Sequence, residues 1–329
     1  MQMQKTLAQP ARLKGVGLHS GRQTSIEVLP TGENHGLVFQ RIDLQGPFAL
    51  VKGLASSISD TRLCTVLRNQ ANVEVRTVEH LLAALRACNI DNALVRLEGQ
   101  EIPILDGSAK DFINAFKASG VVTQNAPRRV IRIDRPVRVH DGDKTAELLP
   151  FDGCRFEVEI EFDNPAIGHQ LRQFDLRFAE FEREIAPART FGELDQAVGL
   201  HAAGLALGAS QHNALIFDGQ TIVSEEGLRF DDECVRHKIL DAIGDLYLIG
   251  APFIGSFKGY KSGHAMHAKL IEALFADPGN FSWIMARNDA LDDTAPFANE
   301  ITEPSTGPLG DIAMPPPRLG IPGGIGTLA

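Results

Sequence analysis

Three ionisable side chains recur at helical spacing in the stretch FDDECVRHKILDAIGD, residues 230–245. His237, Asp241 and Asp245 are each four residues apart, so in a helix they project from one face. One interpretation is a solvated face that carries a His–Asp pair. The other is a metal site, because an imidazole and a carboxylate one helical turn apart can bind the same ion. This stretch alone favours the solvated face.

A second pair lies in TVEHLLAAL, where Glu79 directly precedes His80 at an expected helix start. An exposed first turn is one interpretation, since an acidic residue there suits the helix dipole. A metal ligand beside a proton acceptor is the other. Together with His237 and Asp241, His80 completes two imidazoles and one carboxylate, a set that leaves one coordination position open, as in catalytic zinc sites. Zn²⁺ fits this set best and Fe²⁺ is an alternative. The sequence HExxH is absent, which argues against one large class of zinc proteases.

The elements that must position these residues follow from hydrophobic periodicity. A helix is expected over RTVEHLLAALRAC, with Thr77 as its N-cap, and another over residues 110–119. Alternation with period two predicts strands in both halves of the chain, and these strands precede the helices. The order indicates an α+β fold. The strands are expected at residues 23–30, 36–42, 129–140, 144–151 and 155–162.

A short internal sequence similarity suggests two similar units. DNALVRLEGQEI in the first half resembles HNALIFDGQTIV in the second. We therefore expect two similar two-layer α/β sandwich domains, residues 1–125 and 126–280, with the active site between them. The boundary between them is expected in the polar stretch at residues 120–129. Residues 281–329 are rich in Pro and Gly, which predicts a flexible, disordered tail.

Composition excludes some classes of protein. The 329 residues carry a formal net charge of −10, which is unsuited to neutralising a nucleic-acid backbone. No secretory signal or transmembrane segment is apparent. The four cysteines are scattered, which is typical of a protein in a reducing cytoplasm.

Several motifs together resemble a known family, the UDP-3-O-acyl-N-acetylglucosamine deacetylases, which are zinc amidohydrolases of lipid A biosynthesis in Gram-negative bacteria. The resemblance runs from about Lys5 to Phe275. It implies hydrolysis of the N-acetyl group of UDP-3-O-[(3R)-3-hydroxyacyl]-N-acetylglucosamine, to acetate and a free amine, as the committed step of that pathway. A metal-dependent amidohydrolase that acts on another N-acyl substrate is the alternative. The motifs are TVEHLLAAL, EIPILDGSA, ARTFG, VRHKILDAIGDL and YKSGHA.

The resemblance also implies a role for each matching residue. It makes His80, His237 and Asp241 the metal ligands and Glu79 the general base that activates a metal-bound water. His264 would act as acid and oxyanion stabiliser, with Asp245 as its partner. Ser262 looks like the N-cap of the helix that carries His264. The remaining expected contacts are an oxyanion donor (Thr190), substrate contacts (Phe191 and Lys238), a loop near the metal (Leu63 and Cys64), and His19, for which a structural turn is an equal interpretation.

Further expectations concern the second half and the partners. The resemblance implies that residues 193–210 form an insert of the second domain, with an apolar passage for the acyl chain of a UDP-linked acylated amino sugar. A helix packed in the core is the other interpretation of this stretch. His267 is interpreted as a surface residue. The protein is expected to be a monomer, and a regulatory protease is an expected partner of the tail.

Overall fold

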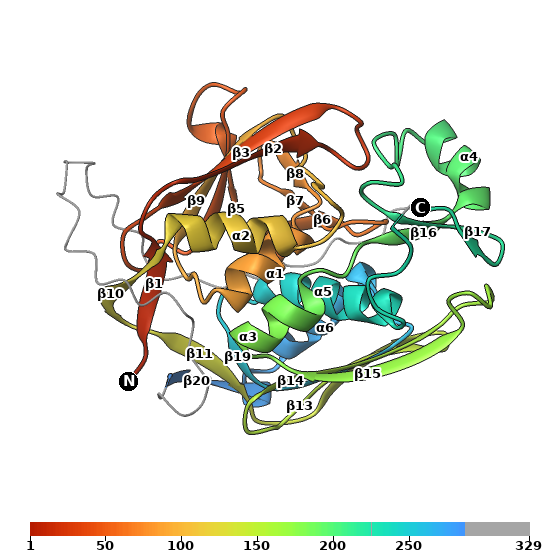
Figure 1. The fold of residues 1–329 in the computed structure, drawn as a ribbon. Helices are drawn as coiled ribbons and strands as arrows, with labels where there is room; N and C mark the ends of the chain where they lie inside the picture. The colour runs from red at the N-terminus through yellow and green to blue at the C-terminus, as the bar shows by residue number, and fades with distance from the viewer. Residues whose placement is uncertain (225, 287–329) are drawn as a thin grey trace, which may run out of the picture. The chain divides into compact units, whose positions relative to one another are not determined.

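The computed structural model describes residues 1–224 and 226–286, which form a mixed α/β fold (Figure 1). Helices and sheets occur in both halves of the chain, so the expected α+β class is confirmed. The division into two similar sandwich domains stays a prediction.

The first half builds a five-stranded sheet in the order β2-β3-β9-β4-β5. Strand β3 is antiparallel to β2 and β9, whereas β4 runs parallel to β9. Thr24, Ile26 and Val28 of β3 are buried while their neighbours are more exposed, as the period-two pattern predicts. The strands are β2 (Ala11–Val16), β3 (Gln23–Pro30), β4 (Leu37–Arg41), β5 (Leu50–Lys52) and β9 (Ala93–Glu98), with a smaller sheet of β6 (Ile58–Asp60), β7 (Val66–Arg68) and β8 (Glu74–Arg76).

The second half builds a seven-stranded sheet around β19 (Phe253–Tyr260). This strand pairs in parallel with β11 and β14 and antiparallel with β13. Its first five residues are all buried, as is typical of a central strand. The other strands are β11 (Arg129–Ile133), β12 (Val137–Asp141), β13 (Lys144–Leu149), β14 (Cys154–Glu161), β15 (His169–Asp175) and β20 (Phe281–Met285).

The polar stretch expected to hold the domain boundary contains a strand. β10 (Val121–Pro127) pairs with β1 (Met3–Leu7) in a two-stranded sheet. The alternation of exposed polar side chains along β10 made the segment look like a loop, although its backbone is paired. The junction between the two halves is therefore held by backbone hydrogen bonds to the N-terminal strand.

Two helices from opposite halves meet in the interior. The first half contributes α1 (Glu79–Ala87) and α2 (Lys110–Ser119), and the second half contributes α5 (Glu233–Tyr247) and α6 (His264–Ala276) (Figure 1). The two that meet are α1 and α5. Every residue of α1 is buried, and most of α5 is buried as well. At Gly244 of α5, an added Cβ would lie 2.0 Å from the carbonyl oxygen of Glu79, so the helices approach more closely than a larger residue permits. The ionisable face of α5 therefore looks into the protein and not into bulk water.

Residues 191–222 form a separate small layer of β16 (Phe191–Glu193), β17 (Leu215–Asp218) and β18 (Thr221–Ile222), with α4 (Leu194–Ala202) beside it. No residue of α4 is buried, and Leu194 and Val198 expose apolar side chains. A loop after α4 rests on the turn at residues 17–21, where Gly208 N donates to Leu18 O and Leu207 N to His19 O. The expected insert, residues 193–210, is therefore an exposed layer attached to the first half at one edge.

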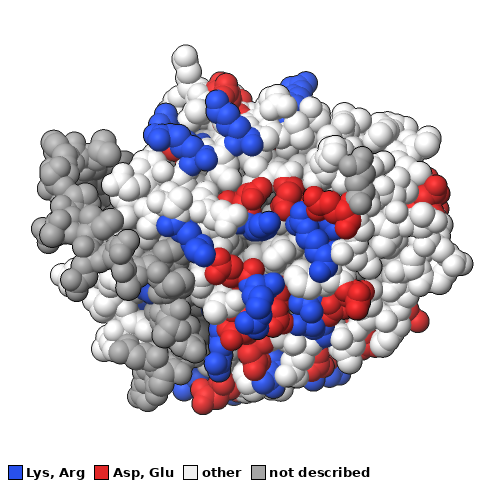
Figure 2. Space-filling view, viewed as in Figure 1, with Lys and Arg blue, Asp and Glu red and all other residues white. Residues whose placement is uncertain are grey.

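Charged side chains of both signs lie close together on the surface. Figure 2 shows Lys and Arg interspersed with Asp and Glu over the lower half of the viewed face. Ion pairs between partly exposed side chains include Arg155–Asp175, with 2.6 Å between Nε and Oδ1.

The C-terminal end of the described chain extends the second sheet. Strand β20 lies within the range expected to be a flexible tail, yet it pairs antiparallel with β11 over its whole length. Its alternating residues Phe281, Trp283 and Met285 give it a strand pattern that the Pro- and Gly-rich composition of the following segment obscured. Residues 287–329 of the expected tail, and the protease expected to act there, lie outside the described residues. Among the helices that are described, none combines the length and apolar character needed to cross a bilayer.

Candidate metal centre and active site

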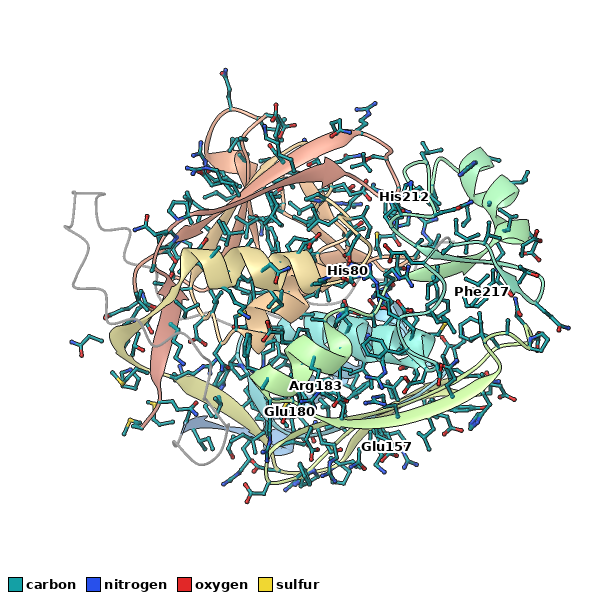
Figure 3. All side chains as sticks on the ribbon, in the orientation of Figure 1. His80, Glu157, Glu180, Arg183, His212 and Phe217 are labelled. Atoms are coloured by element: carbon teal, nitrogen blue, oxygen red, sulfur yellow. The ribbon has the colours of Figure 1, made fainter. Side chains whose placement is uncertain are left out.

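Three buried side chains converge from the two central helices. Nε2 of His237 lies 3.3 Å from Oδ1 of Asp241, and Nε2 of His80 lies 3.6 Å from the same oxygen. The two imidazole rings are nearly perpendicular, with centroids 4.9 Å apart. A tetrahedral ion with bonds of about 2.1 Å requires its ligand atoms to lie about 3.4 Å apart. Figure 3 labels His80 near the middle of the molecule.

The chemistry of this cluster fits a cation. Within the described residues, Oδ1 of Asp241 has no hydrogen-bond partner although it is buried. A buried carboxylate oxygen without a partner is costly, and a metal ion would satisfy it. The three side chains therefore fit the divalent metal ion that the sequence predicted.

His237 is held in the form a metal ligand needs. Its Nδ1 is 3.0 Å from the carbonyl oxygen of Ala188, which can only accept, so Nδ1 carries the proton and Nε2 keeps its lone pair. Burial lowers the pKa of His237 to about 3, which keeps the ring neutral.

Lys238 contacts the other oxygen of the same carboxylate. Its Nζ donates to Oδ2 of Asp241 at 2.9 Å and lies 5.6 Å from the ring centroid of Phe191. Burial opposes ionisation of Asp241, but nearby positive charge, including the Lys238 ammonium, outweighs it and holds the pKa of Asp241 well below its usual range. The carboxylate is thus charged, with one oxygen fixed and one available to a cation.

Glu79 stands beside the cluster as a candidate proton acceptor. It begins α1 and is 2% exposed, and its Oε2 accepts a hydrogen bond from the backbone N–H of Thr65 at 3.1 Å. Burial raises the pKa of Glu79 to about 7. A carboxylate with this pKa is well placed to take and return a proton near neutral pH.

His264 faces Glu79 from the start of α6, with 3.9 Å between Nε2 and Oε1. Its Nδ1 donates to Oδ2 of Asp245 at 2.7 Å. Burial opposes the charged imidazolium, but Asp245 outweighs this and raises the pKa of His264 to about 9. The base and the acid therefore face each other in opposite charge states near neutral pH.

One cavity of about 390 Å³ joins these groups. Thr190, Phe191, Lys238 and Leu63 line it together with the metal cluster, Glu79 and His264. Three of the expected site residues, His19, Cys64 and Asp245, are buried and are not among the lining residues. Asp245 acts from behind His264, and Nδ1 of His19 accepts a hydrogen bond from the backbone of Ala206 at 3.3 Å.

Both expected helix caps are wrong. Val78 caps α1 and Gly263 caps α6, and neither makes a side-chain capping hydrogen bond. Thr77 has a φ of 56° and its hydroxyl donates to Oε1 of Glu101 at 3.1 Å. The hydroxyl is thus used by a long-range partner that periodicity does not reveal.

Sequence reasoning also missed three buried residues around the site. His267, expected at the surface, is 1% exposed, and its Nδ1 is 2.7 Å from Oδ2 of Asp245. Its spacing of three residues from His264 places both on one helix face, which was the available signal. Thr65 bonds to Asp245, and Glu101 accepts from the backbone of His19 and Ser20. No local pattern marks either of them.

A buried set of nitrogen and oxygen ligands, with an acid and a base on the same cavity, is typical of metal-dependent hydrolases. Residues 4–276 match the family described as LpxC: UDP-3-O-acyl N-acetylglycosamine deacetylase. Relatives named UDP-3-O-acyl-N-acetylglucosamine deacetylase, from Vibrio campbellii and Photobacterium profundum, are 46% and 45% identical to the chain over 282 residues. Each alignment covers 85% of this chain and 92% of the relative. The chain belongs to this deacetylase family, and the predicted class of metal-dependent hydrolase is confirmed.

Proposed function

We propose that the protein hydrolyses the N-acetyl group of a UDP-3-O-acyl-N-acetylglucosamine, and releases acetate and a free amine, in lipid A biosynthesis. The observation that supports this best is the convergence of the buried cluster, Glu79 and His264 on one cavity. Membership of the deacetylase family, over most of the chain, supports the choice of substrate.

His80, His237 and Asp241 would hold the metal. Two imidazoles and a carboxylate suit Zn²⁺ best, with Fe²⁺ as the alternative. A divalent ion at this position supplies a Lewis acid, which polarises the amide carbonyl and acidifies water.

Glu79 and His264 would move the protons. Glu79, ionised above its pKa of about 7, accepts the proton of the attacking water at its carboxylate. His264, protonated below its pKa of about 9, donates from Nε2 to the departing amine nitrogen. The hydroxyl of Thr190 lines the same cavity and would donate to the amide oxygen as negative charge develops there.

The substrate would extend along the cavity wall. The Phe191 ring offers an apolar surface, and the neighbouring Lys238 ammonium favours an anionic group such as a diphosphate. Leu63 is 51% exposed and lies at the rim, while Cys64 and His19 would support that rim from behind. The exposed apolar residues of the insert would form the passage for the acyl chain.

Acetate release from acylated and unacylated UDP-N-acetylglucosamine, before and after chelation, tests this proposal. We expect chelator-sensitive release that depends strongly on the acyl chain. Equal turnover of both compounds would favour an amidohydrolase with another N-acyl substrate. Turnover that survives complete metal removal would refute the metal-dependent mechanism.

A further inference from the structure

The Asp245 carboxylate accepts three hydrogen bonds, and only one of them comes from the proposed acid. Oδ2 lies 2.7 Å from Nδ1 of His264 and 2.7 Å from Nδ1 of His267, while Oδ1 accepts from the hydroxyl of Thr65 at 2.6 Å. An ionised carboxylate only accepts, so both imidazoles present a protonated Nδ1 to it. Burial opposes ionisation of Asp245, yet His264 and His267 hold the pKa of Asp245 well below its usual range.

His267 has no route to substrate. Its side chain is 1% exposed, it is not among the residues that line the cavity, and its ring packs at 78° against Phe257. Within the described residues its Nε2 has no hydrogen-bond partner, so Nδ1 makes the one polar contact recorded for this ring. Its ring also meets the His264 ring edge-on, with centroids 6.3 Å apart, so His267 can act on the chemistry only through Asp245 and His264.

We propose that His267 is a positioning residue for the deacetylation, which fixes the Asp245 carboxylate so that His264 turns its Nε2 toward Glu79 and the cavity. The proposal rests on the role given to His264 above. Thr65 restrains one oxygen of the carboxylate and the two histidines restrain the other. Without His267, His264 would be the only restraint on Oδ2, and the carboxylate and the imidazole could turn together. Partners that orient a catalytic group in this way typically contribute roughly 10–100-fold to activity.

Three substitutions at this position separate hydrogen bonding from packing. In His267→Asn the amide nitrogen takes the place of Nδ1 and still donates to Asp245. In His267→Gln the amide lies one methylene further along, near the position of Nε2, and in His267→Leu the donor is gone. We expect the Leu and Gln variants to lose roughly 10–100-fold in kcat, with KM within about twofold of wild type, and the Asn variant to retain most of the rate. Metal content should be the same in all three.

Two further measurements test the route through His264. In ¹⁵N-histidine-labelled protein, the Nδ1–H resonance of His264 should move in the Leu variant and stay near its wild-type position in the Asn variant. On a His264→Ala background, His267→Leu should cost little more. A wild-type kcat for both the Leu and Gln variants would overturn the proposal, as would additive losses in the double variant. A fully active His264→Ala protein would refute the assigned role of His264 itself.

Discussion

At the scale of single residues, two of the proposed metal ligands use one polar atom for a contact within the protein and leave the other for the metal. Asp241 gives Oδ2 to Lys238 and keeps Oδ1 for a cation, and His237 gives Nδ1 to Ala188 and keeps Nε2. Asp241 and His237 are thereby oriented before any ion arrives, which reduces the ordering cost of binding.

The three proposed ligands should be equally necessary. We expect His80→Ala, His237→Ala and Asp241→Ala each to lose bound metal and activity together. Three protein ligands are the fewest typical of a catalytic zinc site. Elemental analysis of the purified variants measures the metal directly, and full occupancy in any one of them would remove that residue from the set.

Glu79→Gln should separate proton transfer from metal binding. The amide keeps the shape of the side chain but cannot accept the proton, so kcat should fall by roughly 10²–10⁴ while metal content is retained. A Glu79→Gln protein with the wild-type rate would contradict the assignment of Glu79 as base.

The dependence of kcat/KM on pH should be bell-shaped. Glu79 must be ionised, so the rate rises with pH through a pKa that burial places at about 7. His264 must be protonated, so the rate falls as pH rises through its pKa of about 9. A bound divalent cation favours the carboxylate and disfavours the imidazolium, which moves both limbs to lower pH. Glu79→Gln should remove the acid limb, and an unchanged profile in that variant would show that another group produces it.

At the scale of elements, the contact between α1 and α5 sets the distance between the ligands. Gly244 lies one turn beyond Asp241 on α5, and its missing side chain lets that helix approach the carbonyl oxygen of Glu79. Any separation of the two helices moves His80 away from His237 and Asp241 and opens the site.

Gly244→Ala should therefore lower the free energy of unfolding by about 1–3 kcal/mol or more, the usual cost of overpacking a core. It should also weaken metal binding. Gly199→Ala is the matched control. This helical glycine of α4 has nothing within 4 Å of its added Cβ, so alanine there should be neutral or slightly stabilising. Thermal melts and metal titrations of the two variants provide the comparison. If Gly244→Ala melts and binds metal like wild type, the close approach of the helices does not control the site.

Elements with regular periodicity could be predicted from the sequence, and those defined by long-range partners could not. The alternation in β3 and the four-residue spacing of His237, Asp241 and Asp245 in α5 are local, and both structures form as expected. The pairing of β10 with β1 and of β20 with β11 depends on strands more than a hundred residues away. In the same way, His80, His237 and Asp241 could be grouped by ligand chemistry, whereas the burial of His267 follows from how α6 packs on α5.

At the scale of the whole molecule, the metal cluster joins the two halves of the chain. His80 comes from the first half and His237 and Asp241 from the second, so a bound ion would act as a crosslink between them. An ion that binds only the folded protein stabilises it in proportion to the logarithm of its concentration.

Chelation should therefore lower the melting temperature of the whole protein and not merely abolish turnover. Stabilisation of about 2.7 kcal/mol is expected when the free metal concentration is 100 times its dissociation constant. The control is His80→Ala, whose melting temperature should not respond to chelator. Identical melting of metal-loaded and chelated wild-type protein would exclude such a crosslink.

Strand β20 has a consequence for the biosynthesis of the protein. The N–H of Gln2 donates to the carbonyl of Ala286, and the N–H of Ala286 donates to the carbonyl of Arg128. Gln2, Arg128 and Ala286, which are synthesised far apart in time, thus meet at one place. Strand β1 can pair with β10 early, but β11 lacks its outer neighbour until residue 285 has left the ribosome. Exposed strand edges promote aggregation, and pairings between distant residues form slowly. The nascent chain is therefore most vulnerable between the emergence of β11 and that of β20, the period in which a chaperone would protect it most.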